Sequence, residues 1–505
     1  MKKDYLKCIN EANIYDVVKR TSLDFQPLLS KRFNNKIYLK REDQQAVFSF
    51  KIRGAFYKML QMTSEALKKG VIAASAGNHA QGVAMAAKKL NSPATIVMPT
   101  TTPEIKTNAV KQHGATVILE GKTLTESILF ARQIEEEKGL TFIHPFDDPD
   151  VIVGQGTIGK EILEDFKEPI YAVFCCVGGG GLISGIAAYI KAVNPTIKII
   201  GVEAKDSEAM TSSLKAKKRV CLERVGLFAE GAAVRQVGVH TFAIAQKYVD
   251  EMIVVDNDEI CAAIKDFYID TRTILEPAGA LATAGIKAYL KNNPVQSQNI
   301  IGIASGANIN FDRLGFVAER AEIGEEREAI ISVTIPEKPG AFKAFCNLIG
   351  TRNITEFNYR YADPKLAQIF VGVTIANADE TQDLIKKFSQ NGLSAIDLTK
   401  NEMAKLHLRY LVGGHAPNAK DEEVYRFEFP ERPGALLNFL EHVGANWNIS
   451  LFHYRNHAAD IGRVLVGFQV PKKDKETFNN FLDQLKYPYF VETDNPGYKL
   501  FLGKN

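Results

Sequence analysis

Short apolar runs alternate with stretches of helical periodicity over the first 320 residues of the chain. This alternation is typical of βαβ units, in which helices connect the buried strands of a parallel sheet. In such folds ligands bind at the carboxyl ends of the strands, so the turns that follow the apolar runs are where chemistry is expected. The predicted buried strands are 70–75 (GVIAAS), 94–98 (ATIVM), 116–119 (TVIL), 172–177 (AVFCCV), 198–202 (KIIGV) and 299–305 (NIIGIAS).

An internal repeat begins after the charged segment 319–328. VTIPEKPGAFKAFCNLIG and NITEFNYR in the first copy correspond to FEFPERPGALLNFLEHVG and NISLFHYR in the second, offset by 94 residues at Pro339 and Pro433 and by 95 at Asn353 and Asn448. Each copy predicts a strand, a Pro-Gly turn, a helix, two strands, a helix and a strand, which is a ferredoxin-like α+β unit of roughly 70 residues. Such a pair is either a structural or dimerisation module or a pair of small-molecule sensors.

The composition, with 46% hydrophobic and 24% charged residues in a chain of 505, is that of a globular protein of several domains. A formal net charge of +3 points to no nucleic-acid or membrane partner. The six cysteines show no CxxC pair or metal-ligand spacing and fit a reduced, cytoplasmic setting. No export signal is visible at the N-terminus. The uncharged stretch 169–190 contains four consecutive glycines, which disfavour a membrane helix.

Lys51, in the stretch SFKIRGA (49–55), has the clearest chemical interpretation. It stands at the predicted first turn of a helix, where the positive end of the helix dipole disfavours an ammonium group. This crowding and partial desolvation are expected to lower its pKa and favour the neutral amine. Because Schiff-base chemistry with a carbonyl requires a neutral amine, we predict that Lys51 is a nucleophile and base. The alternative is a surface lysine whose stem lies along apolar neighbours.

The stretch SAGNHAQG (75–82) follows the predicted strand 70–75 and opens a helix. Its free N–H groups predict a site for a carboxylate or a phosphate. Asn78 is also a candidate for the residue that caps this helix, and the two roles are compatible. His79 is expected to be a packed, hydrogen-bonded residue more than a catalytic base.

The stretch GGGGL, from Gly178 to Leu182, lies between a buried strand and a helix. Backbone amides of a tetraglycine turn approach phosphate oxygens without side chains in between, so we predict a phosphate site here. The alternative is a dinucleotide site, with Glu203 as the acid that binds the ribose. The GxGxxG spacing fails, however, because Ile183 or Ser184 occupies the position of the last glycine.

The stretch SGAN (305–308) ends the last predicted strand and brings the Ser305 hydroxyl to the same pocket. In this order SFKIRGA, SAGNHAQG, GGGGL and SGAN resemble the cofactor-site motifs of the fold-type II pyridoxal-phosphate enzymes, and within them those of the biosynthetic threonine dehydratases (threonine ammonia-lyases). GLFAEGAAV (226–234), EPAGA (276–280), MAKLHLRYLVGG (403–414) and the two repeats extend the resemblance over essentially the whole chain.

The resemblance implies an α/β fold with a catalytic domain of two parallel-sheet subdomains over 1–322, like the tryptophan synthase β chain, and two ferredoxin-like, ACT-like regulatory domains over 329–400 and 423–499. It implies pyridoxal 5'-phosphate as the cofactor. The roles carried over are Lys51 for the covalent link, Asn78 for the phenolic oxygen, Gly178, Gly179, Gly180, Gly181 and Leu182 for the phosphate, and Ser305 for the pyridine nitrogen. The substrate carboxylate would be held by Ser75, Ala76, Gly77, Asn78 and His79.

The implied reaction is the β-elimination of L-threonine to 2-oxobutanoate and ammonia, the first committed step of isoleucine biosynthesis. Lys51 would take the α-proton, and the leaving hydroxyl would be protonated by the cofactor phosphate, by Lys51 or by another donor. A hydroxyl at Ser305 in place of a carboxylate permits a neutral pyridine, a weaker electron sink that favours elimination. In this family the tandem repeats bind isoleucine as inhibitor and valine as activator, and the enzyme is a homotetramer.

No metal is expected. The related serine racemases have a divalent-cation site after an equivalent strand, but here Glu203 is accompanied by Ser207 and Ala209 where further ligands would be needed. The open alternatives are another fold-type II enzyme (a serine dehydratase, a racemase or a β-replacing synthase), an NAD-dependent oxidoreductase, and a catalytically silent amino-acid sensor.

Overall fold

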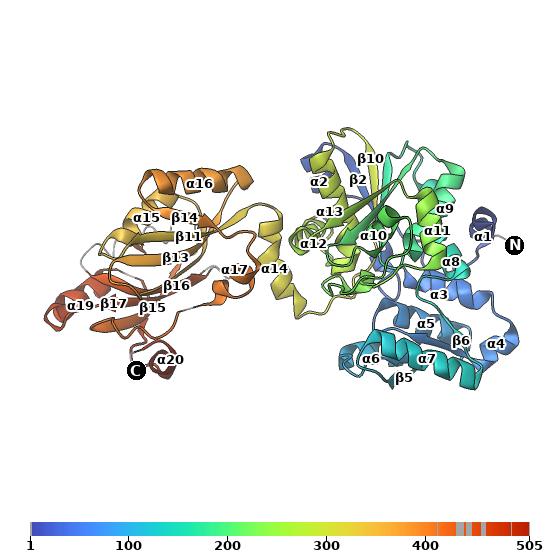
Figure 1. Cartoon of the computed structure of the whole chain (residues 1–505), viewed down its shortest axis with the longest axis horizontal. Coiled ribbons are helices and arrows are strands. Elements are labelled where there is room, and N and C mark those ends of the chain that lie inside the picture. The colour runs from blue at the N-terminus through green and yellow to red at the C-terminus, as the bar shows by residue number, and fades with distance from the viewer. Residues whose placement is uncertain are drawn as a thin grey trace. The chain divides into compact units, whose positions relative to one another are not determined.

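The computed structural model describes residues 3–411, 413–430, 439–440, 447–455, 461–485 and 487–503. The chain forms two compact units, Met1–Gly324 and Glu325–Asn505 (Figure 1). The turn predicted at Pro433 in the second repeat lies outside the described residues.

The first unit contains a four-stranded parallel sheet in the order β5-β4-β3-β6. Its strands are β3 (Val71–Ala74), β4 (Ala94–Met98), β5 (Thr116–Leu119) and β6 (Thr141–Phe142). The helices of this part of the chain, among them α5, α6 and α7 beside the sheet in Figure 1, are α3 (Lys51–Leu60), α4 (Ser64–Lys69), α5 (Asn78–Lys89), α6 (Glu104–Lys111) and α7 (Leu124–Lys138).

A second sheet of the same unit has six strands in the order β1-β2-β10-β7-β8-β9, parallel except for β1. Its strands are β1 (Leu23–Phe25), β2 (Lys36–Arg41), β7 (Ala172–Cys176), β8 (Lys198–Ala204), β9 (Glu251–Val255) and β10 (Asn299–Ala304). The helices are α1 (Tyr5–Glu11), α2 (Pro27–Phe33), α8 (Pro149–Asp165), α9 (Gly181–Val193), α10 (Ala209–Ala216), α11 (Val239–Tyr248), α12 (Asn257–Thr271), α13 (Pro277–Asn292) and α14 (Arg313–Gly324), with the 3-10 turns η1 (Glu42–Gln44) and η2 (Glu230–Ala232).

All six predicted strands are present in these two sheets, as β3, β4, β5, β7, β8 and β10. Strands such as β3 and β7 are buried along their whole length, which explains their continuous apolar sequences. The predicted α/β catalytic fold with two parallel sheets is therefore confirmed.

Helix α3 is held against helix α8 by a close backbone contact and by buried charges. A Cβ added at Gly154 of α8 would lie 2.6 Å from the Cα of Gly54, so glycine is what allows the helices to approach. Next to this contact Arg53 is fully buried and donates to Glu42 (2.7 and 2.8 Å) and to Glu161 (3.0 Å). The ammonium of Lys40, also fully buried, lies 2.7 Å from Glu161.

The second unit is one eight-stranded sheet in the order β14-β11-β13-β12-β16-β17-β15-β18. Strand β12 of the first repeat pairs antiparallel with β16 of the second, from Glu356 opposite Arg455 to Arg360 opposite Leu451. The strands are β11 (Glu328–Pro336), β12 (Ile354–Arg360), β13 (Leu366–Thr374), β14 (Ser394–Asp397), β15 (Glu422–Pro430), β16 (Asn448–Arg455), β17 (Ile461–Gln469) and β18 (Tyr489–Val491). The helices are α15 (Ala341–Ile349), α16 (Ala378–Gln390), α17 (Glu402–Leu406), α19 (Lys475–Gln484) and α20 (Pro496–Phe501), with the 3-10 turns η3 (Leu408–Tyr410) and η4 (Lys472–Asp474).

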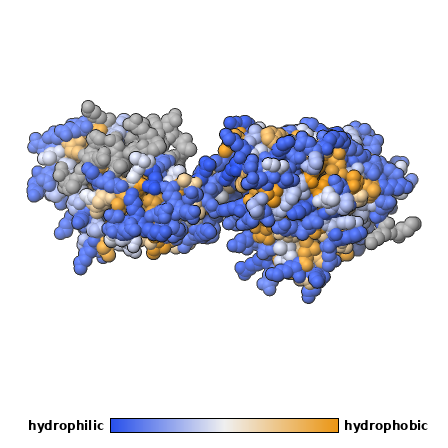
Figure 2. Space-filling model, turned by 90° about the horizontal axis from the view of Figure 1, so that it is seen from above, coloured by the Kyte–Doolittle hydropathy of each residue, from blue (hydrophilic) through white to orange (hydrophobic). Residues whose placement is uncertain are grey.

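The first repeat follows the predicted order of strand, helix, two strands, helix and strand, and the described elements of the second repeat agree with it. The predicted bounds 329–400 and 423–499 stay predictions, because a single sheet runs through both repeats. Over the described residues, every helix is too short or too polar to cross a bilayer. The face of the molecule seen in Figure 2 is mostly hydrophilic, with hydrophobic residues in separate patches.

The charges around Arg53 give a first testable prediction. Arg53→Met removes the cation that pairs with the buried Glu42 and leaves Glu161 with Lys40 alone, so the free energy of unfolding should fall by about 3–5 kcal/mol. Far-UV circular dichroism during urea unfolding measures the loss. Fluorescence would miss it, because the single tryptophan, Trp447, belongs to the second unit.

The matched control is Arg20→Ala. Arg20 also pairs with two carboxylates, Glu164 and Asp165, but its side chain is 42% exposed. Exposed ion pairs contribute about 0–1 kcal/mol, so this variant should stay close to the parent protein. Equal losses in the two variants would show that burial of the Arg53 cluster is not what stabilises helix α3.

Candidate active site

The turns at the carboxyl ends of β3, β7 and β10 meet the first turn of α3 around one cavity. The residues lining it are Phe50, Lys51, Asn78, Phe146, Cys176, Gly178, Gly179, Gly180, Gly181, Leu182, Gly231, Ala232, Glu276, Ala278 and Ser305. The four sequence motifs, although far apart in the chain, thus contribute to a single site.

Lys51 is the first residue of helix α3, as predicted. Its Nζ donates to the carbonyl oxygen of Pro145 at 3.0 Å and lies 5.3 Å from the ring centroid of Phe50. Burial lowers the pKa of Lys51 to about 8, while Cys176 and Glu276 act in the opposite direction. A substantial share of the amine is therefore neutral near physiological pH, as nucleophilic chemistry requires.

The glycine turn joins β7 to helix α9, whose first residue is Gly181. Gly180 has φ of 94°, a left-handed conformation that glycine adopts without strain. A Cβ at Gly179 would lie 2.2 Å from Cγ of Phe146. The free N–H groups at the start of α9 are thus exposed to the cavity through a turn that has no room for side chains.

Ser305 follows strand β10 and is surrounded by neutral partners. Its hydroxyl accepts a hydrogen bond from the Cys176 thiol (3.2 Å) and donates to the carbonyl oxygen of Ala278 (3.4 Å). Burial raises the pKa of Cys176 to about 11, so this thiol stays protonated and serves as a donor. The described contacts of Ser305 include no carboxylate.

In the turn after β3, the residue that caps helix α5 differs from the predicted one. The N-cap of helix α5 is Gly77, and Asn78 is already the first helical residue, so the interpretation of Asn78 as a cap is wrong. The Asn78 side chain instead points to another segment of the chain, where its Nδ2 donates to Glu276 Oε1 at 2.6 Å. Of the five residues predicted to hold the substrate carboxylate, all of them described, Asn78 alone lines the cavity.

The other members of that turn lie beside the cavity wall. Ser75 Oγ accepts from the Gly77 N–H at 3.2 Å, and His79 Nε2 is 2.7 Å from the carbonyl oxygen of Ile143. Burial lowers the pKa of His79 to about 3, so the ring is neutral and donates to that carbonyl. His79 is therefore packed and hydrogen-bonded, as the sequence indicated.

Glu203 has a structural role at the end of β8. Its Oε1 accepts from the Met210 N–H, and its Oε2 accepts from the N–H and the hydroxyl of Thr211, at 2.7–2.8 Å. The carboxylate is fully buried at the start of helix α10 and is not available for a ribose, which removes the support for a dinucleotide site. Within the described ranges, no three His, Cys, Asp or Glu side chains are grouped as a metal site would require.

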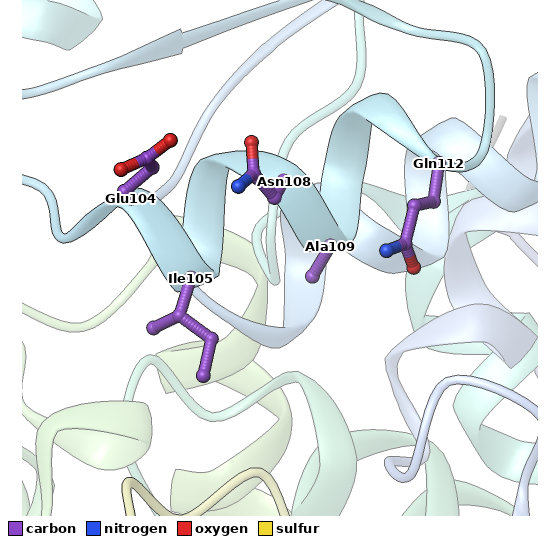
Figure 3. Close-up of a pocket in the computed structure, with 5 residues that line it drawn as sticks. All are labelled: Glu104, Ile105, Asn108, Ala109 and Gln112. Carbon is purple, nitrogen blue, oxygen red and sulfur yellow. The ribbon is translucent and has the colours of Figure 1, made fainter.

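A further hollow lies along helix α6 (Figure 3). Its five lining residues, Glu104, Ile105, Asn108, Ala109 and Gln112, all come from this helix and the residue that caps its end, Gln112. Because no second element closes it, the hollow is an open surface without convergent groups, and we do not regard it as a candidate site.

Comparisons with known proteins agree with this geometry. Residues 14–306 match the family described as pyridoxal-phosphate dependent enzyme, and residues 319–408 and 413–502 match the C-terminal regulatory domain of threonine dehydratase. The biosynthetic L-threonine dehydratase IlvA of Burkholderia multivorans is 54% identical over 502 residues, 99% of each chain. The chain belongs to the biosynthetic threonine dehydratase family.

More distant members and solved structures support the assignment to this family. The chloroplastic biosynthetic threonine dehydratase of Arabidopsis thaliana is 49% identical over 499 residues, which cover 99% of this chain and 84% of the relative. The processed form of threonine deaminase isoform 2 from Solanum lycopersicum matches 63% of this chain and 88% of its own, with a TM-score of 0.62 and 51% identity. Maize serine racemase matches 62% and 96%, with a TM-score of 0.59 and 33% identity.

Members of this family are lyases that use pyridoxal phosphate, and the residues of the cavity fit that cofactor. The glycine turn would be blocked by any Cβ at Gly179, and it presents N–H groups suited to a phosphate. The amine of Lys51 has the lowered pKa that a link to an aldehyde needs. Ser305 offers the pyridine nitrogen a neutral hydroxyl.

Sequence reasoning missed several groups that line the site or support its residues. Glu276 and Asn308 stand in the motifs EPAGA and SGAN, which were quoted without a role for these two side chains. Phe50, next to Lys51, and Phe146, which packs on the glycine turn, gave no signal beyond apolar character. Cys176 was counted only as a cysteine, although it is the hydrogen-bond partner of Ser305.

The glycine turn gives the second prediction. Gly179→Ala should weaken the binding of pyridoxal phosphate at least about fivefold, because the new Cβ displaces the Phe146 ring and overpacking costs about 1–3 kcal/mol. Spectral titration of the apoenzyme measures the dissociation constant. Gly315→Ala is the matched control, since a Cβ there has no heavy atom within 4 Å. Unchanged affinity in Gly179→Ala would contradict the assignment of this turn to the phosphate.

Proposed function

We propose that this chain converts L-threonine to 2-oxobutanoate and ammonia, with pyridoxal phosphate held by Lys51, Asn78, the turn 178–182 and Ser305. The observation that carries the proposal is the meeting, in one cavity, of a buried amine of lowered pKa with a glycine turn at a helix N-terminus. The names of the relatives, threonine dehydratase throughout, supply the substrate.

Lys51 has two tasks in this proposal: it anchors the cofactor, and it takes the α-proton of the substrate once released. Bound pyridoxal phosphate supplies a conjugated ring that accepts the electron pair left by that proton. A general base works best when its pKa is near the working pH, and burial places the pKa of Lys51 at about 8. Its hydrogen bond to the carbonyl oxygen of Pro145 keeps the amine at the cavity wall.

Ser305 supports elimination over other outcomes. Its neighbours, the Cys176 thiol and the carbonyl oxygen of Ala278, carry no charge. A neutral hydroxyl does not hold a proton on the ring nitrogen as a carboxylate would, so the ring is a weaker electron sink. A weaker sink favours prompt loss of the β-hydroxyl over a persistent carbanion.

The substrate carboxylate is assigned to the turn Ser75–His79. The N–H groups in the first turn of helix α5, which is 12 residues long, and the positive end of its dipole favour an anion at this position. A Cβ added at Gly77 would have no heavy atom within 4 Å beyond its chain neighbours, so there is open space on this side of the residue. Asn78, which also lines the cavity, connects this turn to the cofactor site.

We assign the second unit to regulation, with isoleucine as the inhibitor, valine as the activator and a homotetramer as the assembly. The family match of residues 319–408 and 413–502 to a regulatory domain supports the role of the two repeats. The two repeats form one sheet, so a movement of either repeat would disturb the β12–β16 pairing. This supports a joint conformational response of the two repeats to effector binding. Allostery then requires that isoleucine bind one state of the enzyme better than another.

We place the enzyme in the cytoplasm. All six cysteines are free thiols in the structure, from the exposed Cys221 to the fully buried Cys175 and Cys261. Free thiols are typical of a reducing compartment.

Replacement of the anchoring amine is the third prediction and tests the proposal directly. Lys51→Ala should abolish the release of 2-oxobutanoate from threonine and the visible absorbance of the enzyme-linked cofactor, with the circular dichroism spectrum unchanged. Lys68→Ala, an exposed lysine on helix α4, is the control and should retain both signals. Turnover that survives in Lys51→Ala rules out the assignment.

The fourth prediction concerns the second unit. Isoleucine should raise the threonine concentration needed for half-maximal 2-oxobutanoate release severalfold, and valine should reverse the shift, because coupling energies of about 1–3 kcal/mol are typical of allosteric enzymes. Steady-state saturation curves measure this, with alanine as the control amino acid. Curves that superimpose in the presence and absence of isoleucine would leave the repeats without the proposed effector.

A further inference from the structure

We propose that Glu276 is a positioning residue that, together with Asn308, fixes the side-chain amide of Asn78 so that one N–H bond of Asn78 faces the cavity. Three segments meet at this point: the first turn of α5, the residue before α13 and the turn after β10. The inference rests on the proposed function, because the cofactor is the group that this N–H would meet.

The orientation of the amide follows from counting donors and acceptors. Asn308 donates to the carbonyl oxygen of Val47 at 2.9 Å, and a carbonyl oxygen can only accept, so the Asn308 atom at this junction is Nδ2. The second N–H of Asn308 Nδ2 points to Asn78 at 2.5 Å, so the facing atom of Asn78 is its oxygen. The remaining atom of the Asn78 amide, Nδ2, is then the donor to Glu276.

An amide nitrogen has two N–H bonds, and Glu276 takes one of those of Asn78. In the described part of the chain the other has no acceptor, and Asn78 lines the cavity. Without Glu276 and Asn308 the amide could rotate by 180° and present an acceptor in place of this donor. Together Glu276 and Asn308 prevent this rotation, so one N–H bond of Asn78 can donate to a ligand oxygen in the cavity.

The surroundings of Glu276 are shaped for this contact. The side chain is 7% exposed, and a Cβ at Gly306 would lie 2.5 Å from its Oε1, so glycine at 306 leaves room for the carboxylate. The N–H of Glu276 donates to the Gly306 carbonyl oxygen at 3.2 Å, which fixes the backbone of the residue as well. Burial raises the pKa of Glu276 to about 7, yet its unprotonated oxygen accepts from Asn78 in either protonation state.

A double-mutant cycle on the apoenzyme tests the inference, with the dissociation constant of pyridoxal phosphate from spectral titration as the readout. Glu276→Ala and Asn78→Ala should each weaken binding about tenfold, the loss of one hydrogen bond. In the Asn78→Ala background, Glu276→Ala should add less than about twofold, because Glu276 acts through Asn78. Glu276→Gln keeps an acceptor and should stay within about threefold of the parent protein.

Two further variants keep the test decisive if Glu276→Ala does not fold. Asn308→Asp is nearly isosteric but turns the donor to Asn78 into an acceptor, so it should also weaken cofactor binding about tenfold. Glu104→Ala removes an exposed carboxylate on α6 and serves as the control for charge loss. Thermal unfolding of each apoenzyme confirms that the variants are folded.

Three results would overturn the inference: losses that multiply in the double mutant, a Glu276→Gln variant as weak as Glu276→Ala, or an Asn308→Asp variant as tight as the parent. These failures are distinct from failure of the proposed function. If the parent protein itself binds no pyridoxal phosphate or releases no 2-oxobutanoate from threonine, the proposed function is wrong. If the parent protein does both and the losses in cofactor affinity multiply in the double mutant, only the proposed role of Glu276 is wrong.

Discussion

The buried ion cluster around Arg53 is the constraint on which the position of Lys51 depends. The two residues lie in the first turn of the same helix, α3, and Arg53 is tied to Glu42 of η1 and Glu161 of α8 without access to water. Sliding or rotating α3 would separate charges in a medium that does not solvate them, which is far costlier than losing surface contacts. The reactive amine is thus positioned by interactions that no ligand of the cavity can reach.

Five of the six strands that sequence reasoning found, β5 being the exception, are buried through apolar side chains, as in β3 and β7. Strand β2, KIYLKR, was missed because its pattern contains Lys40 and Arg41, which are nonetheless buried. Their charges are compensated by carboxylates more than a hundred residues away in one case, Glu161, and two residues away in the other, Asp43. Hydrophobic patterning assigns lysine and arginine to the surface, so paired buried cations are invisible to it.

The motifs of the site could be found from sequence because their signal is local: small residues after a strand mark a place where backbone amides are exposed. The groups that orient them could not. Glu276 reaches Asn78 across 198 positions and Asn308 reaches it across 230, and each is an ordinary turn residue in its own segment. The prediction of Asn78 as a cap failed for the same reason, because its side chain bonds to Glu276, which is far away in the sequence.

The continuous sheet of the second unit has a consequence for how the repeats hold together. Strands β12 and β16 would each be the outer strand of its own repeat, and in the sheet each covers the other. A chain that stopped before the second copy would leave the N–H and C=O groups of β12 along Glu356–Arg360 open to any extended segment, including that of another molecule. Because both repeats belong to one chain, β16 is present near β12 at an effective concentration that does not depend on the protein concentration. The β12–β16 pairing therefore persists at dilutions where a separate subunit would dissociate.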